Sequence, residues 1–287
     1  MKSFLRVTIF AVLLIAPSAY ALSVSAPTLS VLPEHILQGD PVLVEVVGAT
    51  STEISSITFL GVSAPIFTNN GKPSALFGTE LSKPVGEYKI TAKLKDGRKI
   101  GKTVSIEWRG QPVVTFEIPK KLGGGTPAGE KKVVTSLVNE NTRLNALKSV
   151  NTKLWSGAFR FPVSNPFVTE NFGPFRDSGA YRIPHKGTDF RAPEGTPVRS
   201  IAAGKVILVE VFPTYGKAVA VDHGAGVVSI YLHLSKILVK NGAIVPAGTL
   251  LGKSGQTGLA SAPHLHLSIK IGGVSIDPMT FFKLFSH

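Results

Sequence analysis

The feature that most limits the fold of this chain is a recurring pattern of short runs in which apolar and polar residues alternate. The clearest run is Tyr88–Leu94, and turn pairs such as Asn70-Gly71 and Asp96-Gly97 separate the runs. Alternate residues of a β-strand face the same side, so each run describes a strand with one buried face. From residue 25 to residue 109 the pattern predicts a small immunoglobulin-like β-sandwich.

A second β domain is expected beyond a connector. Gly123–Gly125 marks a flexible segment, and apolar residues then recur at helical spacing, which predicts one amphipathic helix near residues 129–150. From Phe159 onward the chain is again strand-rich, with glycine or proline at nearly every joint. We therefore expect an all-β fold with a sandwich at 22–110, a linker with one helix at 111–158 and an antiparallel β domain at 159–287. The apolar positions of the helix are Val133, Val134, Leu137, Val138, Leu144, Leu147 and Val150.

The first residues have the composition of a signal peptide. Lys2 and Arg6 precede an apolar run at Val7–Ala16, and Ala19-Tyr20-Ala21 fits a small-x-small cleavage site. The alternative is an uncleaved anchor, but the run is shorter than the ~20 residues that span a bilayer. We expect residues 1–21 to be removed, with no stable membrane span afterwards, and the protein to be exported to the periplasm or the extracellular space.

The charge and the absence of cysteine restrict the partners and the metal ligands. With Cys 0, a disulfide framework and thiolate metal or redox sites are excluded, so a metal would need histidines and carboxylates. Loss of Lys2 and Arg6, with no acidic residue, takes the formal charge from +13 to +11. Such a field favours a polyanion. The basic residues are dispersed and form no nucleic-acid-binding motif, so an anionic envelope polymer is expected rather than nucleic acid.

One candidate cluster pairs His185 with Asp189, four residues apart. In a straight strand their Cα atoms would lie ~13 Å apart, a strained reach for two ligands of one ion. A helix would bring them together, but the prolines and Gly187 around them oppose a helix. We therefore expect a bend at Gly187 that lets both side chains converge.

Three further histidines lie on predicted strands. His264 and His266 are two residues apart and face the same side of one strand, whereas His233 follows the apolar run Val227–Ile230. Taken singly, each histidine is more often structural than a ligand. Jointly, the bent pair and the strand pair form a candidate zinc site of two imidazoles and one carboxylate, with the fourth position open to water as in catalytic zinc sites.

These segments resemble a known enzyme family. His185–Asp189, Tyr231–Leu234 and Pro263–His266 look like the signature of the lysostaphin-type zinc endopeptidases, peptidase family M23, over roughly residues 160–280. The resemblance implies that the domain at 159–287 is an M23 peptidase domain with His185, Asp189 and His266 as Zn²⁺ ligands. It also implies two non-ligand catalytic histidines, His233 and His264, and a tyrosine, Tyr181, that hydrogen-bonds the developing oxyanion. One departure is Ser261-Ala262, where the family more often has a glycine before Pro-His-Leu-His.

The expected activity follows from that resemblance. We expect a secreted zinc metalloendopeptidase that hydrolyses peptide cross-links of bacterial peptidoglycan, with peptidoglycan peptide stems as its partner and D,D-endopeptidase activity as the first choice. The sequence leaves open which of His233 and His264 is the general base. The alternative is a non-catalytic envelope protein of the same fold that binds wall or activates an amidase. The N-terminal sandwich is either a spacer or a wall-binding or autoinhibitory module.

Overall fold

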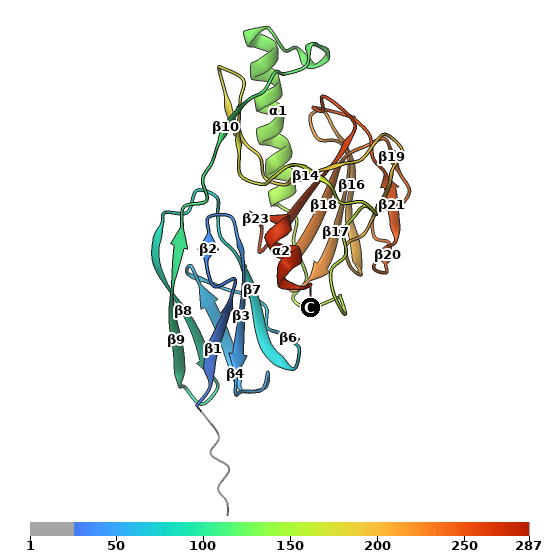
Figure 1. Cartoon of the computed structure of the whole chain (residues 1–287). Helices are drawn as coiled ribbons and strands as arrows, with labels where there is room; N and C mark the ends of the chain where they lie inside the picture. The colour runs from blue at the N-terminus through green and yellow to red at the C-terminus, as the bar shows by residue number, and fades with distance from the viewer. Residues whose placement is uncertain (1–25, 287) are drawn as a thin grey trace, which may run out of the picture.

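The computed structural model describes residues 26–286, and the chain is mostly β-structure with two α-helices in that range (Figure 1). The expected β fold is confirmed, and the signal peptide expected at residues 1–21 lies outside the described residues. Within the described range, no helix has the length and apolar character needed to cross a membrane.

The N-terminal region consists of two sheets of mostly antiparallel strands that enclose an apolar core, including Ile57, Phe59 and Ile90. Burial alternates in β1 and in the second half of β8, whereas β3 and β7 are buried along almost their whole length. The immunoglobulin-like topology stays a prediction. One sheet has the order β1 (Thr28–Leu32), β3 (Pro41–Val47), β7 (Lys72–Gly78), β6 (Phe67–Asn69). The other has the order β2 (Ile36–Leu37), β9 (Lys99–Glu107), β8 (Gly86–Leu94), β4 (Ile54–Phe59), β5 (Val62–Ser63).

The C-terminal region is built on one eight-stranded sheet with two smaller sheets beside it. The large sheet has the order β11 (Val168–Glu170), β14 (Thr188–Arg191), β22 (His264–Ile271), β18 (Val227–Leu234), β17 (Gly216–Gly224), β16 (Gly204–Phe212), β20 (Ile244–Val245), and β23 (Val274–Ile276) also pairs with β22. The smaller sheets are β15 (Pro197–Arg199), β21 (Leu250–Lys253), β19 (Lys236–Ile237), and β10 (Val113–Thr115), β12 (Phe175–Asp177), β13 (Arg182–Pro184).

The linker helix, α1 (Pro127–Asn145), differs in its limits from the predicted 129–150. It begins early because Thr126 caps it, accepting a hydrogen bond from the Gly129 amide, with Pro127 in the first turn. It ends at Asn145, and the following residues turn towards β17, where the Ser149 hydroxyl and the Val150 amide donate to Asp222. A short 3-10 helix, η1 (Lys120–Leu122), precedes α1.

A second helix, α2 (Pro278–Leu284), was not predicted for the C-terminal region. Its signals are local, since Asp277 accepts from the Met279 amide as the N-cap and Pro278 occupies the first turn. Phe281 and Phe282 of α2 are buried in the core on one face of the eight-stranded sheet.

The N-terminal sheet of β3 and β7 is docked on the C-terminal region beside α2 and β23 (Figure 1). Leu43 and Leu76 belong to the same apolar cluster as the C-terminal core. Arg109 forms ion pairs with Asp40 of the sandwich and Asp277 of the α2 cap. The sandwich is therefore fixed against the domain that carries the candidate site.

Candidate metal centre

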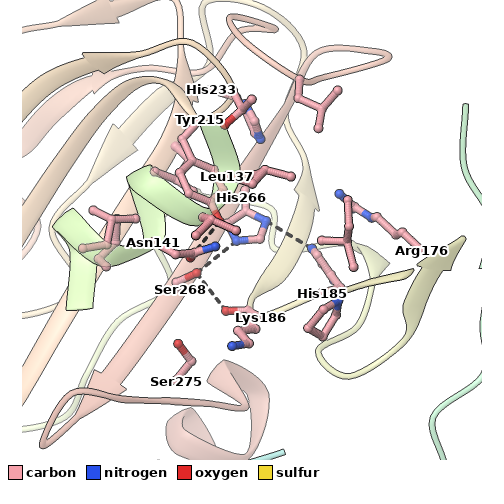
Figure 2. A pocket seen from close by; sticks show the side chains of 18 of the residues that line it. Leu137, Asn141, Arg176, His185, Lys186, Tyr215, His233, His266, Ser268 and Ser275 are labelled. Atoms are coloured by element: carbon pink, nitrogen blue, oxygen red, sulfur yellow. Dashed lines mark hydrogen bonds between the residues drawn. The ribbon is translucent and has the colours of Figure 1, made fainter. Parts of the chain in front are cut away.

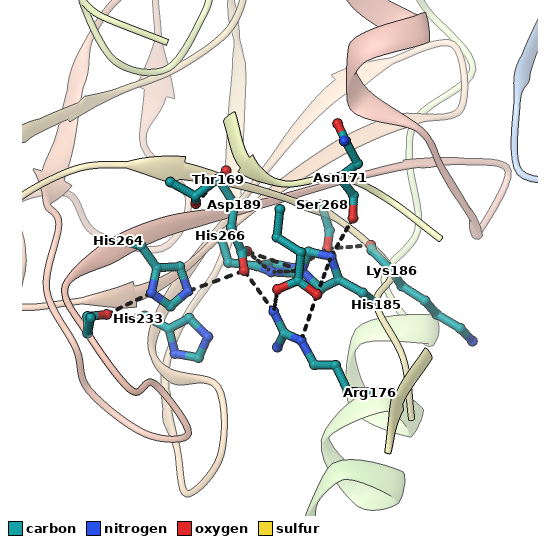
Figure 3. A network of polar contacts seen from close by, with 12 residues as sticks. Thr169, Asn171, Arg176, His185, Lys186, Asp189, His233, His264, His266 and Ser268 are labelled. Carbon is teal, nitrogen blue, oxygen red and sulfur yellow. Dashed lines mark hydrogen bonds and ion pairs between the residues drawn. The ribbon is translucent and has the colours of Figure 1, made fainter. Parts of the chain in front are cut away.

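His185, Asp189 and His266 meet at one point in the structure (Figure 3). Asp189 lies directly opposite His266 in the register of β14 and β22, and His185 lies two residues before the bend at Gly187. The His266 Nδ1 atom lies 2.7 Å from Asp189 Oδ1 and 3.1 Å from His185 Nε2, and His185 Nε2 lies 3.2 Å from Asp189 Oδ1. All three side chains are buried.

Each histidine has its other ring nitrogen held by an outer hydrogen bond. His185 Nδ1 lies 2.8 Å from the Asn171 carbonyl oxygen, which only accepts, so Nδ1 carries the proton. The Ser268 hydroxyl donates to the Lys186 carbonyl and therefore accepts from His266 Nε2 at 3.0 Å. Both rings thus direct an unprotonated nitrogen at the shared point.

This donor set fits a zinc ion. Two nitrogen lone pairs and a carboxylate oxygen at these separations repel one another unless a cation lies between them. Zinc ligands at ~2.0–2.1 Å in tetrahedral geometry are separated by ~3.3 Å, close to the 2.7–3.2 Å found here. Two imidazoles and one carboxylate leave the fourth position open, as in catalytic zinc sites.

The position of Gly187 requires glycine because another strand packs closely against it, in addition to the bend that the chain makes there. It lies in a bend between β13 and β14, as predicted. A Cβ atom built on Gly187 would lie 2.3 Å from His266 Nε2 and 2.6 Å from the Leu267 carbonyl oxygen. Any larger residue would therefore displace His266 from its outer hydrogen bond to Ser268.

Arg176 of β12 is a site residue that the sequence reasoning missed. Its Nη2 atom donates to Asp189 Oδ2 at 2.8 Å, and its Nε atom donates to Glu170 at 3.1 Å. Nothing in the spacing of the sequence signals Arg176, because its position depends on the pairing of β12 with β13 and β10.

His233 and His264 adjoin the cluster, with ring centroids 4.9 Å apart. Each directs Nδ1 at a backbone carbonyl at 2.8 Å, Thr257 for His233 and Ala262 for His264. The His264 Nε2 atom lies 3.7 Å from Asp189 Oδ2 and has no hydrogen-bond partner among the described residues. Burial, followed by the neighbouring His264 and His266, lowers the pKa of His233 to about 3, so its ring is neutral near pH 7.

The backbone of His233 is unusual. Its φ of 59° is in the left-handed region, which a non-glycine residue rarely adopts, and its amide donates to the Tyr215 carbonyl in a loop. Such strained conformations concentrate at functional sites. Strand periodicity could not predict this, because His233 departs from strand geometry at the end of β18.

Two tyrosines differ in their relation to the site. Tyr181 lies in the turn between β12 and β13, where its amide and carbonyl contact Ser178, and it lines neither cavity beside the cluster. Its proposed oxyanion role stays a prediction. Tyr215 lines the same cavity as His233 and His266 and donates to Asn141 of α1 at 3.0 Å. Burial raises its pKa to about 12.

Helix α1 forms one wall of the cavity at the metal centre (Figure 2). The cavity has a volume of about 250 Å³, and a second of about 370 Å³ lies on the His264 side of the cluster. Glu140 anchors α1 here, because its carboxylate accepts from the Thr214 and Tyr215 amides at 2.9 and 2.8 Å. The linker thus contributes directly to the shape of the site.

The C-terminal region therefore has the β-sheet scaffold and the two-histidine, one-carboxylate centre of a zinc peptidase domain. Residues 183–278 of this region match the family described as Peptidase family M23. The five histidine and aspartate residues predicted to surround the zinc all fall within this segment and lie together in the structure: His185, Asp189, His233, His264 and His266.

Curated relatives match less than half of the chain. The peptidoglycan DD-endopeptidase ShyA of Vibrio cholerae is 40% identical over 123 residues, which is 42% of this chain and 29% of the relative. ShyB of the same organism, also a peptidoglycan DD-endopeptidase, is 38% identical over 124 residues, 42% of this chain and 29% of the relative. The chain thus spans less than a third of the length of these relatives.

A solved structure extends the likeness beyond the C-terminal domain. A crystal structure from Pseudomonas aeruginosa, described as a peptidase M23, is 28% identical with a TM-score of 0.64. The alignment covers 86% of this chain and 94% of that chain. A similar arrangement of the N-terminal and C-terminal regions is therefore present in that protein.

Proposed function

We propose that this protein is an exported zinc endopeptidase that hydrolyses peptide cross-links of bacterial peptidoglycan, acting as a D,D-endopeptidase. The observation that carries the proposal is the convergence of two unprotonated imidazole nitrogens and one carboxylate oxygen, with the free Nε2 atom of His264 beside them. The family match and the names of ShyA and ShyB support the substrate. The signal-peptide pattern supports export to the periplasm or beyond.

In this proposal His185, Asp189 and His266 hold the zinc, and Arg176 fixes the carboxylate. Zinc in such a site supplies Lewis acidity and lowers the pKa of a bound water towards ~7. Arg176 keeps Asp189 Oδ2 engaged, which leaves Oδ1 for the ion. The outer hydrogen bonds to Asn171 and Ser268 keep both imidazoles in the tautomer that binds metal.

His233 and His264 handle the protons. Each has Nδ1 bound to a backbone carbonyl, so each presents Nε2 as the acceptor. One Nε2 accepts a proton from the attacking water and then donates that proton to the leaving amine, and the other ring stabilises charge on the substrate when it carries a proton on Nε2. His264 is partly exposed, with a side chain at 17%, and is the more accessible of the two.

The alternative from the sequence is a non-catalytic envelope protein of the same fold. The observation on its side is that α1 lines one wall of the cavity at the metal centre. The presence of all three metal-binding side chains and both additional histidines favours the enzyme. A non-catalytic binder has no need for an uncompensated lone-pair cluster, which costs stability when buried.

A defined cross-linked substrate tests the proposal. The chain without residues 1–21 is incubated with a purified D-alanyl cross-linked peptide dimer, with and without chelator, and the products are identified by mass spectrometry. Chelator-sensitive release of the two monomers is expected. An intact dimer after incubation with the zinc-loaded protein would favour the non-catalytic alternative, and cleavage at another amide would correct the bond.

A further inference from the structure

Lys270 is a buried cation on the same strand and the same sheet face as the metal centre. Residues at every second position of β22 face one side, so His266, Ser268 and Lys270 line up along the cavity floor. The intervening Leu267 and Ile269 face the apolar core on the other side. Lys270 is only 7% exposed.

Neutral groups alone accept hydrogen bonds from this ammonium group. Its Nζ atom donates to Asn145 Oδ1 of α1 at 2.5 Å and to the Gly273 carbonyl at 3.3 Å. Across residues 26–286 it forms no ion pair with a carboxylate. Burial, followed by the charge of Lys186, lowers the pKa of Lys270 to about 8. A buried charge that is hydrogen-bonded only to neutral groups is costly, so an anionic partner would stabilise it.

The cavities beside Lys270 carry the same excess of positive charge. Lys186 and Lys270 line both the cavity at the metal centre and an adjoining one of about 450 Å³. Among the described residues that line the first cavity there is no aspartate or glutamate, and its two arginines are already paired with carboxylates elsewhere. Glu80 lines the adjoining cavity but is exposed and forms no ion pair with Lys270.

The path between the metal centre and this charge is polar. In the view of Figure 2, Ser268, Lys186 and Ser275 lie one after another below His266. Ser268 is hydrogen-bonded to both the His266 ring and the Lys186 carbonyl. Four residues of β-strand span ~13 Å, and an extended peptide advances at nearly the same rate. The lysine side chain can extend back towards the metal centre, so the distance between the scissile amide and the bound carboxylate can be shorter than this span.

We propose that Lys270, assisted by Lys186, binds a free carboxylate of the peptide substrate and so selects acidic peptides. The inference rests on the proposed endopeptidase function and adds a specificity determinant to it. In the proposed pose the substrate runs along β22, which puts the carboxylate two to four residues from the scissile amide. Asn145 and the Gly273 carbonyl hold the ammonium group until the substrate supplies its counter-charge.

Paired substrates test this without altering the protein. Cleavable peptides carry one carboxylate two, three or four residues from the scissile bond, on either side, and each has a carboxamide twin. At one position the carboxylate should lower KM about tenfold relative to its twin with little change in kcat, as for a charged hydrogen bond. Cleavage without discrimination at any position would overturn the inference alone, whereas failure to cleave any peptide would overturn the proposed function as well.

Variants of Lys270 assign the effect to this residue. Lys270→Met retains much of the apolar stem and should abolish the carboxylate preference by raising KM for the acidic peptide only, whereas Lys270→Arg should retain the preference. Lys240→Met, at an exposed lysine outside these cavities, is the matched control. A preference that persists in Lys270→Met would contradict the assignment. If Lys270→Met fails to fold, the substrate series with the wild-type protein and with Lys270→Arg still shows whether the protein prefers the carboxylate.

Discussion

The N-terminal sandwich and the C-terminal sheet are built from the same alternating strands, but they bury different side chains. The sandwich encloses an apolar core, with Ile57, Phe59 and Ile90 among its members. The C-terminal sheet packs Leu265 and Leu267 on one face, while the other face of the same strand buries His266. Burying polar groups costs free energy unless partners satisfy them. Because the sandwich strands also bury Glu45 and Ser74, burial of polar side chains alone does not mark the site; the convergence of buried histidines and a carboxylate at one point does.

The largest expected effect concerns the carboxylate at the centre of the polar face. Asp189→Ala removes one metal-binding atom and leaves Arg176 without one of its two carboxylate partners, so stoichiometric zinc and all measurable cleavage should be lost. Metal analysis and the peptide assay check this. Asp96→Ala, in an exposed turn of the sandwich, is the control and should change neither. Zinc retained at full stoichiometry in Asp189→Ala would show that Asp189 is not a zinc ligand and that the buried polar face of the C-terminal sheet does not depend on it for metal binding.

His264→Ala should separate catalysis from metal binding. We expect turnover to fall ~10²–10⁴-fold, the range for loss of a general acid or base, while zinc stays bound. The reason is that His264 Nε2 faces the cluster without belonging to the three-atom group. Exposed His35→Ala in the sandwich serves as the control. Near-normal hydrolysis by His264→Ala would refute the catalytic assignment.

Arg176→Met tests the outer support of the site. Loss of an outer partner of a metal ligand typically lowers metal affinity or activity ~10–100-fold. We therefore expect the zinc dissociation constant to rise by a factor in that range. Arg182→Met is matched, because Arg182 lies in the same hairpin and lines the same cavity but pairs with Asp177. Competition with a zinc-binding dye measures both. Equal weakening in the two variants would indicate a general effect of charge.

The smallest effect on chemistry is expected from the sandwich core. Phe59→Ala leaves a cavity and should lower the free energy of unfolding by about 3–5 kcal/mol, with little change in kcat of the folded protein. Denaturant unfolding and the peptide assay give the two values. A large fall in kcat with intact folding would show that the sandwich takes part in the reaction.

The sequence predicted the features that depend on local spacing. The period of two placed His264 and His266 on one face, and the bend at Gly187 allowed His185 and Asp189 to converge. The role of Gly187 in admitting the His266 ring could not be predicted, because it depends on residues 79 positions apart that only pairing of β14 with β22 brings together.

Features that depend on tertiary packing escaped prediction. The apolar spacing of α1 indicated a buried face but did not identify its partner, which includes Leu259 and Tyr215 beside the metal centre. Arg176 likewise has no sequence signal, since it reaches Asp189 only through the fold. The left-handed backbone of His233 runs against the strand pattern that precedes it.

On the proposed function, one zinc ion held by His185, Asp189 and His266 makes this domain an endopeptidase. Zinc titration of the metal-free protein, followed by cleavage of the cross-linked peptide dimer, tests it most directly. No cleavage is expected without metal, and the rate should rise linearly and reach its plateau at one zinc per chain. Full activity in the metal-free protein, or none with one zinc bound, would contradict it.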